Sequence, residues 1–284
     1  MLVHKRKGAL LSVLLFCAGL GYIALALRID ADTAVIERHF GEVRRSDARQ
    51  ARIYFEILAI DAVNENLRLR VSFAPSPALQ GRRPGVADQN LRVQLGDGEH
   101  VQELMFRAQE AMPAASLDAN LDDGTVAFYP LDRFRARLHV AAYDATGAPV
   151  PLQVTVWEGV VGWTLDVAQT PGDVAGEVQL RLSVRRSAAL QLLVLAIYGE
   201  MVLIGLAALT IGGVTFLGTR PAESTLMGAL TGMIFALPVL RYALPGSPPL
   251  GVRADLLMFF WAELAVALAL VLFVATWARA KMRV

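Results

Sequence analysis

The sequence contains very little cysteine and carries almost no net charge. Its 284 residues include one cysteine, Cys17, so no disulfide can form within the chain. Lysine and arginine number 27 against 26 aspartates and glutamates, which leaves a net charge of +1. A balance this even excludes the strongly basic composition by which many proteins hold nucleic-acid phosphates. We therefore expect no nucleic-acid partner.

Motifs that carry catalysis or hold cofactors are missing as well. The sequence has no zinc-ligand spacing, no Walker phosphate loop and no GxSxG nucleophile elbow. Serine, histidine and aspartate are present, but no local pattern arranges them as a catalytic triad. We therefore expect no catalytic residue, no cofactor and no metal site, and we expect the chain not to be an enzyme.

What the sequence does have is long apolar runs. Hydrophobic residues make up 55% of the chain and its mean hydropathy is +0.46, above the roughly 45–50% apolar usage of soluble domains. Four runs each reach the ~20 residues that a helix needs to cross a bilayer. They cover residues 8–27, 188–217, 225–244 and 256–278. Because lipid offers backbone groups no hydrogen-bond partner, we expect four transmembrane helices, one N-terminal and three C-terminal.

Basic residues at both ends predict the orientation of these helices. Lysine and arginine gather in residues 1–7 and again in residues 279–284. Since cytoplasmic segments are rich in these residues, we expect both termini in the cytoplasm of a multi-pass protein of the plasma (inner) membrane. Residues 28–187 are then extracytoplasmic. The first run, residues 8–27, also fits a cleavable signal peptide, but its length favours a retained signal anchor.

Residues 28–187 show the alternation that is typical of β-strands. In residues 67–73 and 178–184, hydrophobic residues alternate with arginine and other polar residues, which places one set in a core and the other in water. Residues 53–60 and 152–157 predict further strands, separated by turns rich in glycine and aspartate. Short strands with regular turns predict an antiparallel β-sandwich. The whole chain is thus predicted to be a membrane protein of mixed fold class, with one β-sandwich domain and four transmembrane α-helices.

One segment of this domain, YPLDRFRARLHV, joins a predicted corner to a predicted strand. Tyr129, Pro130 and Asp132 make the corner, because proline fixes its own φ and restricts the residue before it. The aspartate can accept hydrogen bonds from nearby backbone N–H groups and hold the turn.

Cations occupy every second position of the strand that follows. They are Arg133, Arg135, Arg137 and His139. This face can be an ordinary solvated surface whose charges discourage edge-to-edge aggregation. Alternatively, it can be a basic strip that binds acidic lipid headgroups, a glycan or an acidic partner. Acidic side chains on the adjacent strands would favour the first interpretation.

Three ionisable residues interrupt the C-terminal apolar runs: Glu200, Arg241 and Glu263. Such groups are costly in hydrocarbon, so they usually face protein or water and form pairs. Counting along the helices places all three in the outer half of the bilayer, where Arg241 could reach either carboxylate. We therefore predict an intramembrane charge cluster. It can fix helix packing or carry a proton or ion, whereas a residue without a partner can extend to the interface.

Two longer motifs carry a resemblance that covers nearly the whole chain. The first is GTVAFYPLDRFRARL, and the second is LPVLRYALPGSPPLGVRADLLMFFWAEL, the more specific of the two. With their order and the apolar runs, they resemble an uncharacterised bacterial membrane family, domain of unknown function 4436. The resemblance implies the architecture and no activity. In the second motif it rests on Pro245, Gly246, Pro248, Pro249, Asp255 and Trp261.

These features predict a binding or scaffold subunit, or another accessory subunit, of the cell envelope. Its partners would be the lipid bilayer and other envelope or membrane proteins, with a ligand that the sequence does not identify. The alternative is a sensor or transporter component, in which the outer domain is coupled to the Glu200–Arg241–Glu263 cluster. An enzyme acting on envelope material is a third interpretation.

Overall fold

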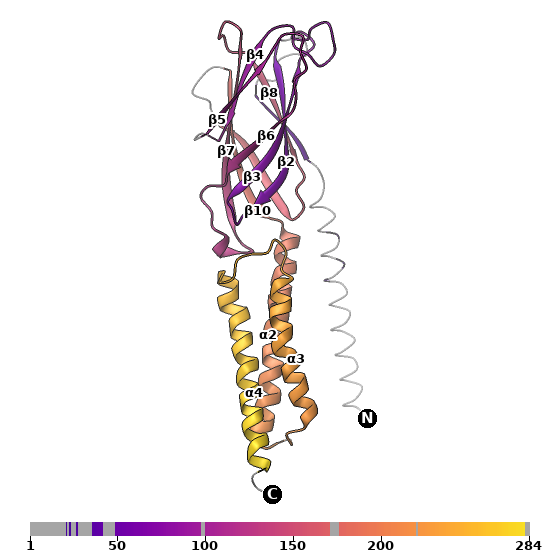
Figure 1. Ribbon diagram of the computed structural model, residues 1–284, viewed down its shortest axis with the longest axis vertical. Helices are drawn as coiled ribbons and strands as arrows, with labels where there is room; N and C mark the ends of the chain where they lie inside the picture. Colours follow the sequence, from indigo (N-terminus) through magenta and orange to yellow (C-terminus); the bar gives the residue numbers. More distant parts are fainter. Residues whose placement is uncertain are drawn as a thin grey trace. The chain divides into compact units, whose positions relative to one another are not determined.

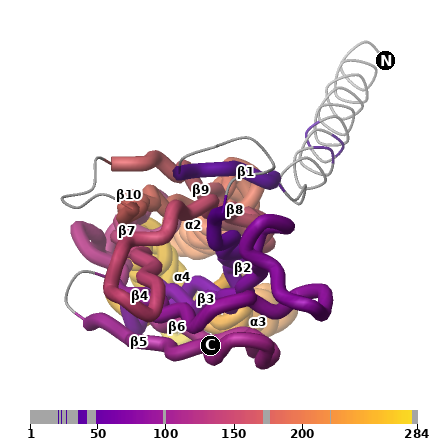
Figure 2. The backbone as a smooth tube through the Cα atoms, turned by 90° about the horizontal axis from the view of Figure 1, so that it is seen from above, coloured from indigo at the N-terminus to yellow at the C-terminus, as the bar shows by residue number. Residues whose placement is uncertain are grey.

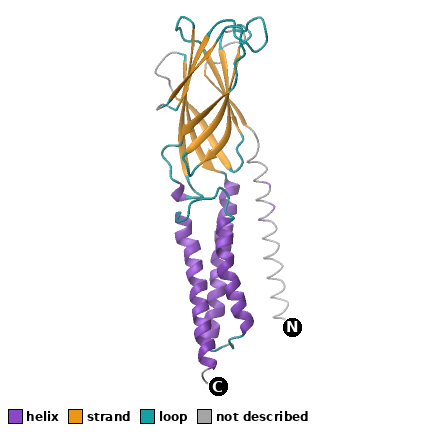
Figure 3. Ribbon diagram, viewed as in Figure 1, coloured by secondary structure: helices purple, strands orange, loops and turns teal. Residues whose placement is uncertain are grey.

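The computed structural model describes residues 36–41, 49–97, 100–170, 176–219 and 221–281, together with the single positions 21, 23 and 27. Apart from these three positions, the predicted first span lies outside the described residues, as do residues 1–7. The described chain divides into two compact units. Figures 1 and 3 show that one unit is built of strands and the other of helices.

The sandwich unit contains the described residues up to Thr125 and the segment Arg133–Ser187. Its strands form two five-stranded sheets, seen from above in Figure 2. The first sheet runs in the order β1 (Ile36–Gly41), β8 (Leu152–Glu158), β2 (Ala51–Asp61), β3 (Asn66–Pro75) and β6 (Ala115–Asn120). The second runs in the order β5 (Val101–Phe106), β4 (Leu91–Gly96), β7 (Arg133–Asp144), β10 (Glu177–Arg186) and β9 (Trp163–Thr170).

The core of this unit follows from the two-residue period of its strands. In β3, Leu67, Leu69 and Val71 are fully buried while Arg68 and Arg70 between them are exposed. The same alternation holds along β10. Buried residues of both sheets join in one hydrophobic cluster, where each buried leucine or valine contributes about 1.5–3 kcal/mol relative to an exposed one. The predicted two-sheet, sandwich-like domain is therefore confirmed.

One strand pair departs from the predicted antiparallel arrangement. Strands β2 and β8 run parallel, with Ala51 opposite Leu152, while the other pairings of the named strands are antiparallel. A tight hairpin forces its two strands to be antiparallel, but β2 and β8 are separated by most of the sandwich sequence. Their pairing is set by the packing of the whole sheet, which a local pattern does not encode.

The helical unit combines Val126–Asp132 with the described residues from Ala188 onward. It contains the short 3₁₀-helix η1 (Val126–Phe128) and the helices α2 (Ala188–Phe216) and α3 (Ser224–Tyr242). A π-helical turn, η2 (Asp255–Phe259), continues directly into α4 (Phe260–Lys281). Three of these helical stretches are long and apolar enough to cross a membrane, which confirms the three predicted C-terminal apolar helices.

Glycines let α2 and α4 approach each other closely. A Cβ atom added to Gly212 would lie 2.7 Å from Cα of Ala269, and one added to Gly205 would lie 3.0 Å from Cα of Ala262. Small residues are the usual means of close packing between apolar helices, because lipid supplies no hydrophobic force to drive them together. The α2–α4 contact is therefore specified by residue size.

Candidate functional site

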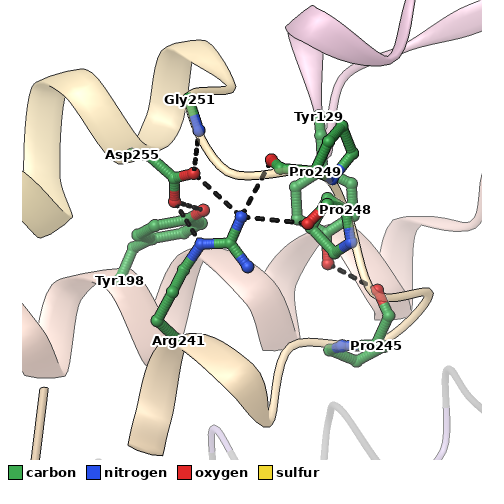
Figure 4. A network of polar contacts seen from close by, with 8 residues as sticks. All are labelled: Tyr129, Tyr198, Arg241, Pro245, Pro248, Pro249, Gly251 and Asp255. Carbon is green, nitrogen blue, oxygen red and sulfur yellow. Dashed lines mark hydrogen bonds and ion pairs between the residues drawn. The ribbon is translucent and has the colours of Figure 1, made fainter. Parts of the chain in front are cut away.

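The second part of the loop between β6 and β7, Val126–Asp132, belongs to the helical unit. Tyr129 in this loop is buried, and its hydroxyl donates a hydrogen bond to the carbonyl oxygen of Pro245, with 2.8 Å between the oxygens. Pro245 lies in the turn that follows α3 (Figure 4). The two sequence motifs described above therefore meet, and the tyrosine ring fills space among the helices.

A buried ion pair lies beside this contact. Nε of Arg241, in the last turn of α3, lies 2.5 Å from Oδ1 of Asp255, and Nη2 lies 2.8 Å from Oδ2. Arg241 is 5% exposed and Asp255 is fully buried. The two parallel N–H···O contacts are the bidentate geometry that makes arginine–carboxylate pairs strong and directional.

The carboxylate of Asp255 is surrounded by donors from three parts of the unit. The Tyr198 hydroxyl, from α2, donates to Oδ1 at 2.7 Å, and the backbone N–H of Gly251 donates to Oδ2 at 2.9 Å. With the two bonds from Arg241, each oxygen accepts two hydrogen bonds. A buried carboxylate is costly unless it is paired and hydrogen-bonded in this way.

The guanidinium of Arg241 also holds the turn before η2. Its Nη2 donates to the carbonyl oxygens of Pro248 and Pro249, each at 3.0 Å. The side chains of Tyr198, Arg241 and Asp255, with the two proline carbonyls and the Gly251 N–H, are called the polar clamp below (Figure 4). The clamp links α2, the end of α3, the following turn and the start of η2 through charge-assisted hydrogen bonds.

Comparison with protein families gives two matches along the chain. Residues 42–184 match the family described as Domain of unknown function (DUF4436), and residues 186–280 match Domain of unknown function (DUF8686). This chain belongs to the DUF4436 family. No curated protein matches it. The Tyr129–Pro245 hydrogen bond joins the DUF4436 segment to the DUF8686 segment, because one partner lies in each.

Other residues of the two motifs serve the local structure around the clamp. Gly246 has a φ of 76°, a left-handed conformation that glycine adopts without strain, and it helps to turn the chain after α3. Pro130 forms a cis peptide bond with Tyr129, and Asp132 is buried at the end of the loop. Trp261 is partly exposed at the start of α4, outside the clamp.

The predicted pairing of Arg241 with Glu200 or Glu263 is wrong, because Arg241 pairs with Asp255. Glu200 is exposed on α2 and Glu263 is half-buried on α4, and neither forms an ion pair with any residue that the structure describes. The sequence placed Asp255 just outside the membrane span. The turn between α3 and η2 instead folds back and brings Asp255 against the end of α3.

The clamp also fixes how far Glu200 and Glu263 lie along their helices relative to each other. Because Tyr198 bonds to Asp255, the two residues lie at the same level of the helical unit. Glu200 is two residues further along α2, or about 3 Å, and Glu263 is eight residues beyond Asp255, or roughly 12 Å. Glu200 therefore lies close to the level of the clamp, and Glu263 lies well below it.

The basic strip on β7 has acidic neighbours. Nη1 of Arg135 lies 3.2 Å from Oδ2 of Asp123, and Nη2 of Arg137 lies 3.7 Å from Oδ2 of Asp122. On the neighbouring strand β10, Oε1 of Glu177 lies 2.5 Å from Nδ1 of His139. Arg133 is exposed and, among the described residues, forms no ion pair. The acidic neighbours favour the interpretation of this strip as a solvated face of the DUF4436 domain.

Tyr198 is the residue of the clamp that sequence analysis missed. Its signal was the one tyrosine of a predominantly apolar run, since a buried tyrosine hydroxyl generally needs a partner. As for metals, no group of three or more histidine, cysteine, aspartate or glutamate side chains in the described part of the chain is placed to hold one.

Proposed function

We propose that this DUF4436 chain is a binding or scaffold subunit of the cell envelope. Its helices lie in the plasma (inner) membrane, residues 28–187 are extracytoplasmic, and both termini are cytoplasmic. Three helices with the length and composition of membrane spans support the membrane location. The sandwich presents its strands to the envelope, and its partners are other envelope or membrane proteins.

The polar clamp is the observation that carries this proposal. Its carboxylate accepts four hydrogen bonds from protein donors, and its guanidinium is directed at protein oxygens. A group engaged in this way holds neighbouring segments in a fixed arrangement and has little capacity left to exchange a proton or bind an ion. Helices held in one fixed arrangement suit a scaffold.

The edge of the second sheet supports a binding role. Strand β5 lies at this edge. Two of its apolar side chains are exposed, Met105 at 73% and Val101 at 58%. An edge strand offers unpaired N–H and C=O groups that can add a strand from another protein. Apolar side chains on such an edge would provide the contact area.

Photo-crosslinking in native membranes tests this role. A photoreactive residue at Met105 should give one adduct of defined mass in the intact membrane, and the same partner should co-purify in mild detergent. The matched control is Asn64, in the exposed turn between β2 and β3 of the other sheet, which should give none. Met105→Glu should abolish co-purification. Absence of any adduct at Met105 and at the other exposed positions of both sheets would contradict the proposal.

A transporter or sensor component is the second candidate, favoured by one observation. Glu263 is half-buried within an apolar helix and has no ion-pair partner among the described residues. Intramembrane carboxylates of this kind often belong to proton or ion pathways. Proton or cation flux into liposomes that is lost in Glu263→Gln or Glu200→Gln would support this candidate. Equal flux in protein-free liposomes would eliminate it.

A further inference from the structure

We propose that one end of the helical unit carries a collar of loop residues that inserts into the outer interfacial layer of the bilayer. The collar consists of Phe128, Leu131, Tyr242, Leu250 and Arg253. The first four are 44%, 58%, 85% and 70% exposed, although all are apolar or aromatic. The proposal rests on the helices lying in a membrane and is independent of the binding role of the sandwich.

Two contacts bring the collar residues to the same end of the helical unit. The Tyr129–Pro245 hydrogen bond fixes the loop of Phe128 and Leu131 to the turn after α3. The guanidinium carbon of Arg253 lies 3.9 Å from the centre of the Phe128 ring. Tyr242 follows Arg241 at the end of α3, and Leu250 follows Pro249 in the turn, so both lie next to the clamp.

The apolar surface of the helices continues on both sides of the collar. On one side, Leu256 and Leu257 of η2 are exposed. On the other, α2 extends ten residues past the level at which Tyr198 bonds to Asp255, which is about 15 Å, and Leu192 on this extension is exposed too. Exposed apolar residues that cluster at one end of a helical unit mark an interaction surface or a membrane contact. The same lipid that covers the helices would cover the collar.

The collar also has the chemistry of a membrane interface. Tyrosine, like Tyr242, and tryptophan concentrate where hydrocarbon meets headgroups, because their rings are apolar but carry a polar group. Arg253 lies over an aromatic ring and, among the described residues, forms no ion pair. Its remaining N–H groups are free to donate to a lipid phosphate. The occupant that fits the collar is therefore the headgroup region of the outer leaflet, anionic lipid included.

Depth-dependent fluorescence quenching tests this. The full chain, with Cys17→Ser, would carry a polarity-sensitive probe at Phe128→Cys, Leu131→Cys or Leu250→Cys, in vesicles of phosphatidylethanolamine and phosphatidylglycerol. Lipids spin-labelled near the headgroup should quench these probes about twofold or more beyond a probe at Thr146→Cys. A probe at Leu264→Cys, which is 71% exposed on α4, is the control for membrane insertion and is read with lipids spin-labelled in the acyl chain.

Each outcome separates the collar from the membrane location. Quenching at Leu264 with no quenching at the collar would overturn the collar and leave the membrane location intact. No quenching at either position would overturn both. Collar probes that are shielded from water yet unquenched by lipid would show that protein covers the collar, which also overturns the proposal. Arg253→Gln should reduce the quenching only in vesicles that contain phosphatidylglycerol, and unchanged thermal midpoints would establish that each variant folds.

Discussion

The hydroxyl of Tyr129 donates to the carbonyl oxygen of Pro245 across 116 residues of sequence. One residue lies between two strands of the sandwich, and the other lies between two helices. Tyr129 is therefore part of the helical unit, although its neighbours in sequence form strands. The hydrogen bond steadies the turn whose next carbonyls, from Pro248 and Pro249, accept from Arg241.

Loss of one member of the buried ion pair should be strongly destabilising. Arg241→Met leaves the carboxylate of Asp255 buried without its cation, which is expected to cost about 3–5 kcal/mol. The unfolding free energy of the helical unit, measured by denaturant titration in detergent, should fall by this amount. Arg181→Met is the control, because Arg181 is exposed on the sandwich; it should change stability by less than about 0.5 kcal/mol.

Replacing both members of the pair should restore part of the stability. In Arg241→Met with Asp255→Leu no buried charge remains, so the double variant should be more stable than Arg241→Met alone. A double variant that loses the sum of the two single effects would mean that the residues do not act as a pair.

The two buried tyrosines should differ in what their hydroxyls contribute. Tyr198→Phe removes a donor to a buried carboxylate, so we expect a loss of about 1.5–3 kcal/mol. Tyr129→Phe removes a bond to a neutral carbonyl and should cost about 0.5–1.5 kcal/mol. The comparison uses the same titration. A larger loss in Tyr129→Phe would contradict the placement of Asp255 at the centre of the network.

Adjacent glycines in α2 offer a matched pair for testing helix packing. A Cβ at Gly212 would lie 2.7 Å from Cα of Ala269, whereas a Cβ at Gly213 would meet no atom within 4 Å. Gly212→Ala should therefore push α2 from α4 and cost about 1–3 kcal/mol. Gly213→Ala should be neutral or slightly stabilising, because alanine is the better helix former. Equal effects of the two substitutions would refute the close α2–α4 contact.

The sandwich should show a pH dependence that traces to Glu158. Its Oε1 lies 3.0 Å from Nε of Arg38, but burial still raises the pKa of this carboxyl above its usual range. The folded state therefore holds the proton more tightly than the unfolded state. The carboxyl thus favours folding at acid pH, and this contribution is lost as pH rises through the raised pKa.

Glu158→Gln removes this titration and should flatten the pH profile. Relative to the original chain, the variant should gain stability as pH rises above about 4.3, the ordinary pKa of a glutamate. The thermal midpoint, followed by circular dichroism of the strands, measures the change. Glu56→Gln is the control, since Glu56 also pairs with an arginine, Arg70, but is exposed. If the thermal midpoint of Glu158→Gln changed with pH in the same way as that of the original chain, the buried carboxyl would be excluded as the source of the pH dependence.

The fold was predictable where a local period decides it. Alternation in residues 67–73 and 178–184 correctly predicted β3 and β10, and length and apolarity predicted three helices. The parallel pairing of β2 with β8 was not predictable, because segments far apart in sequence choose each other through the packed core. The same holds for the residues before β7, which pack with the helices rather than the strands.

The sequence identified two of the three side chains of the candidate site, but neither Tyr198 nor the pairing of Arg241. Sequence analysis identified Arg241 and Asp255, but it sought the partner of Arg241 by counting depth along straight helices. The turn after α3 contains Gly246 and Gly251, both with positive φ, and it reverses the chain tightly enough to return Asp255 to Arg241. Backbone conformations of this kind depend on the fold as a whole, so spacing alone assigned the wrong carboxylates.

Residue accessibility at Thr146 tests the central claim most directly. With Cys17→Ser and Thr146→Cys, the chain would carry one cysteine, in the exposed turn after β7. We predict that a maleimide unable to cross the plasma membrane labels it in intact spheroplasts, and that the labelled chain stays in alkali-washed membranes. Labelling only after the membrane is opened, or recovery of the chain in the soluble fraction, would contradict a membrane-anchored extracytoplasmic sandwich.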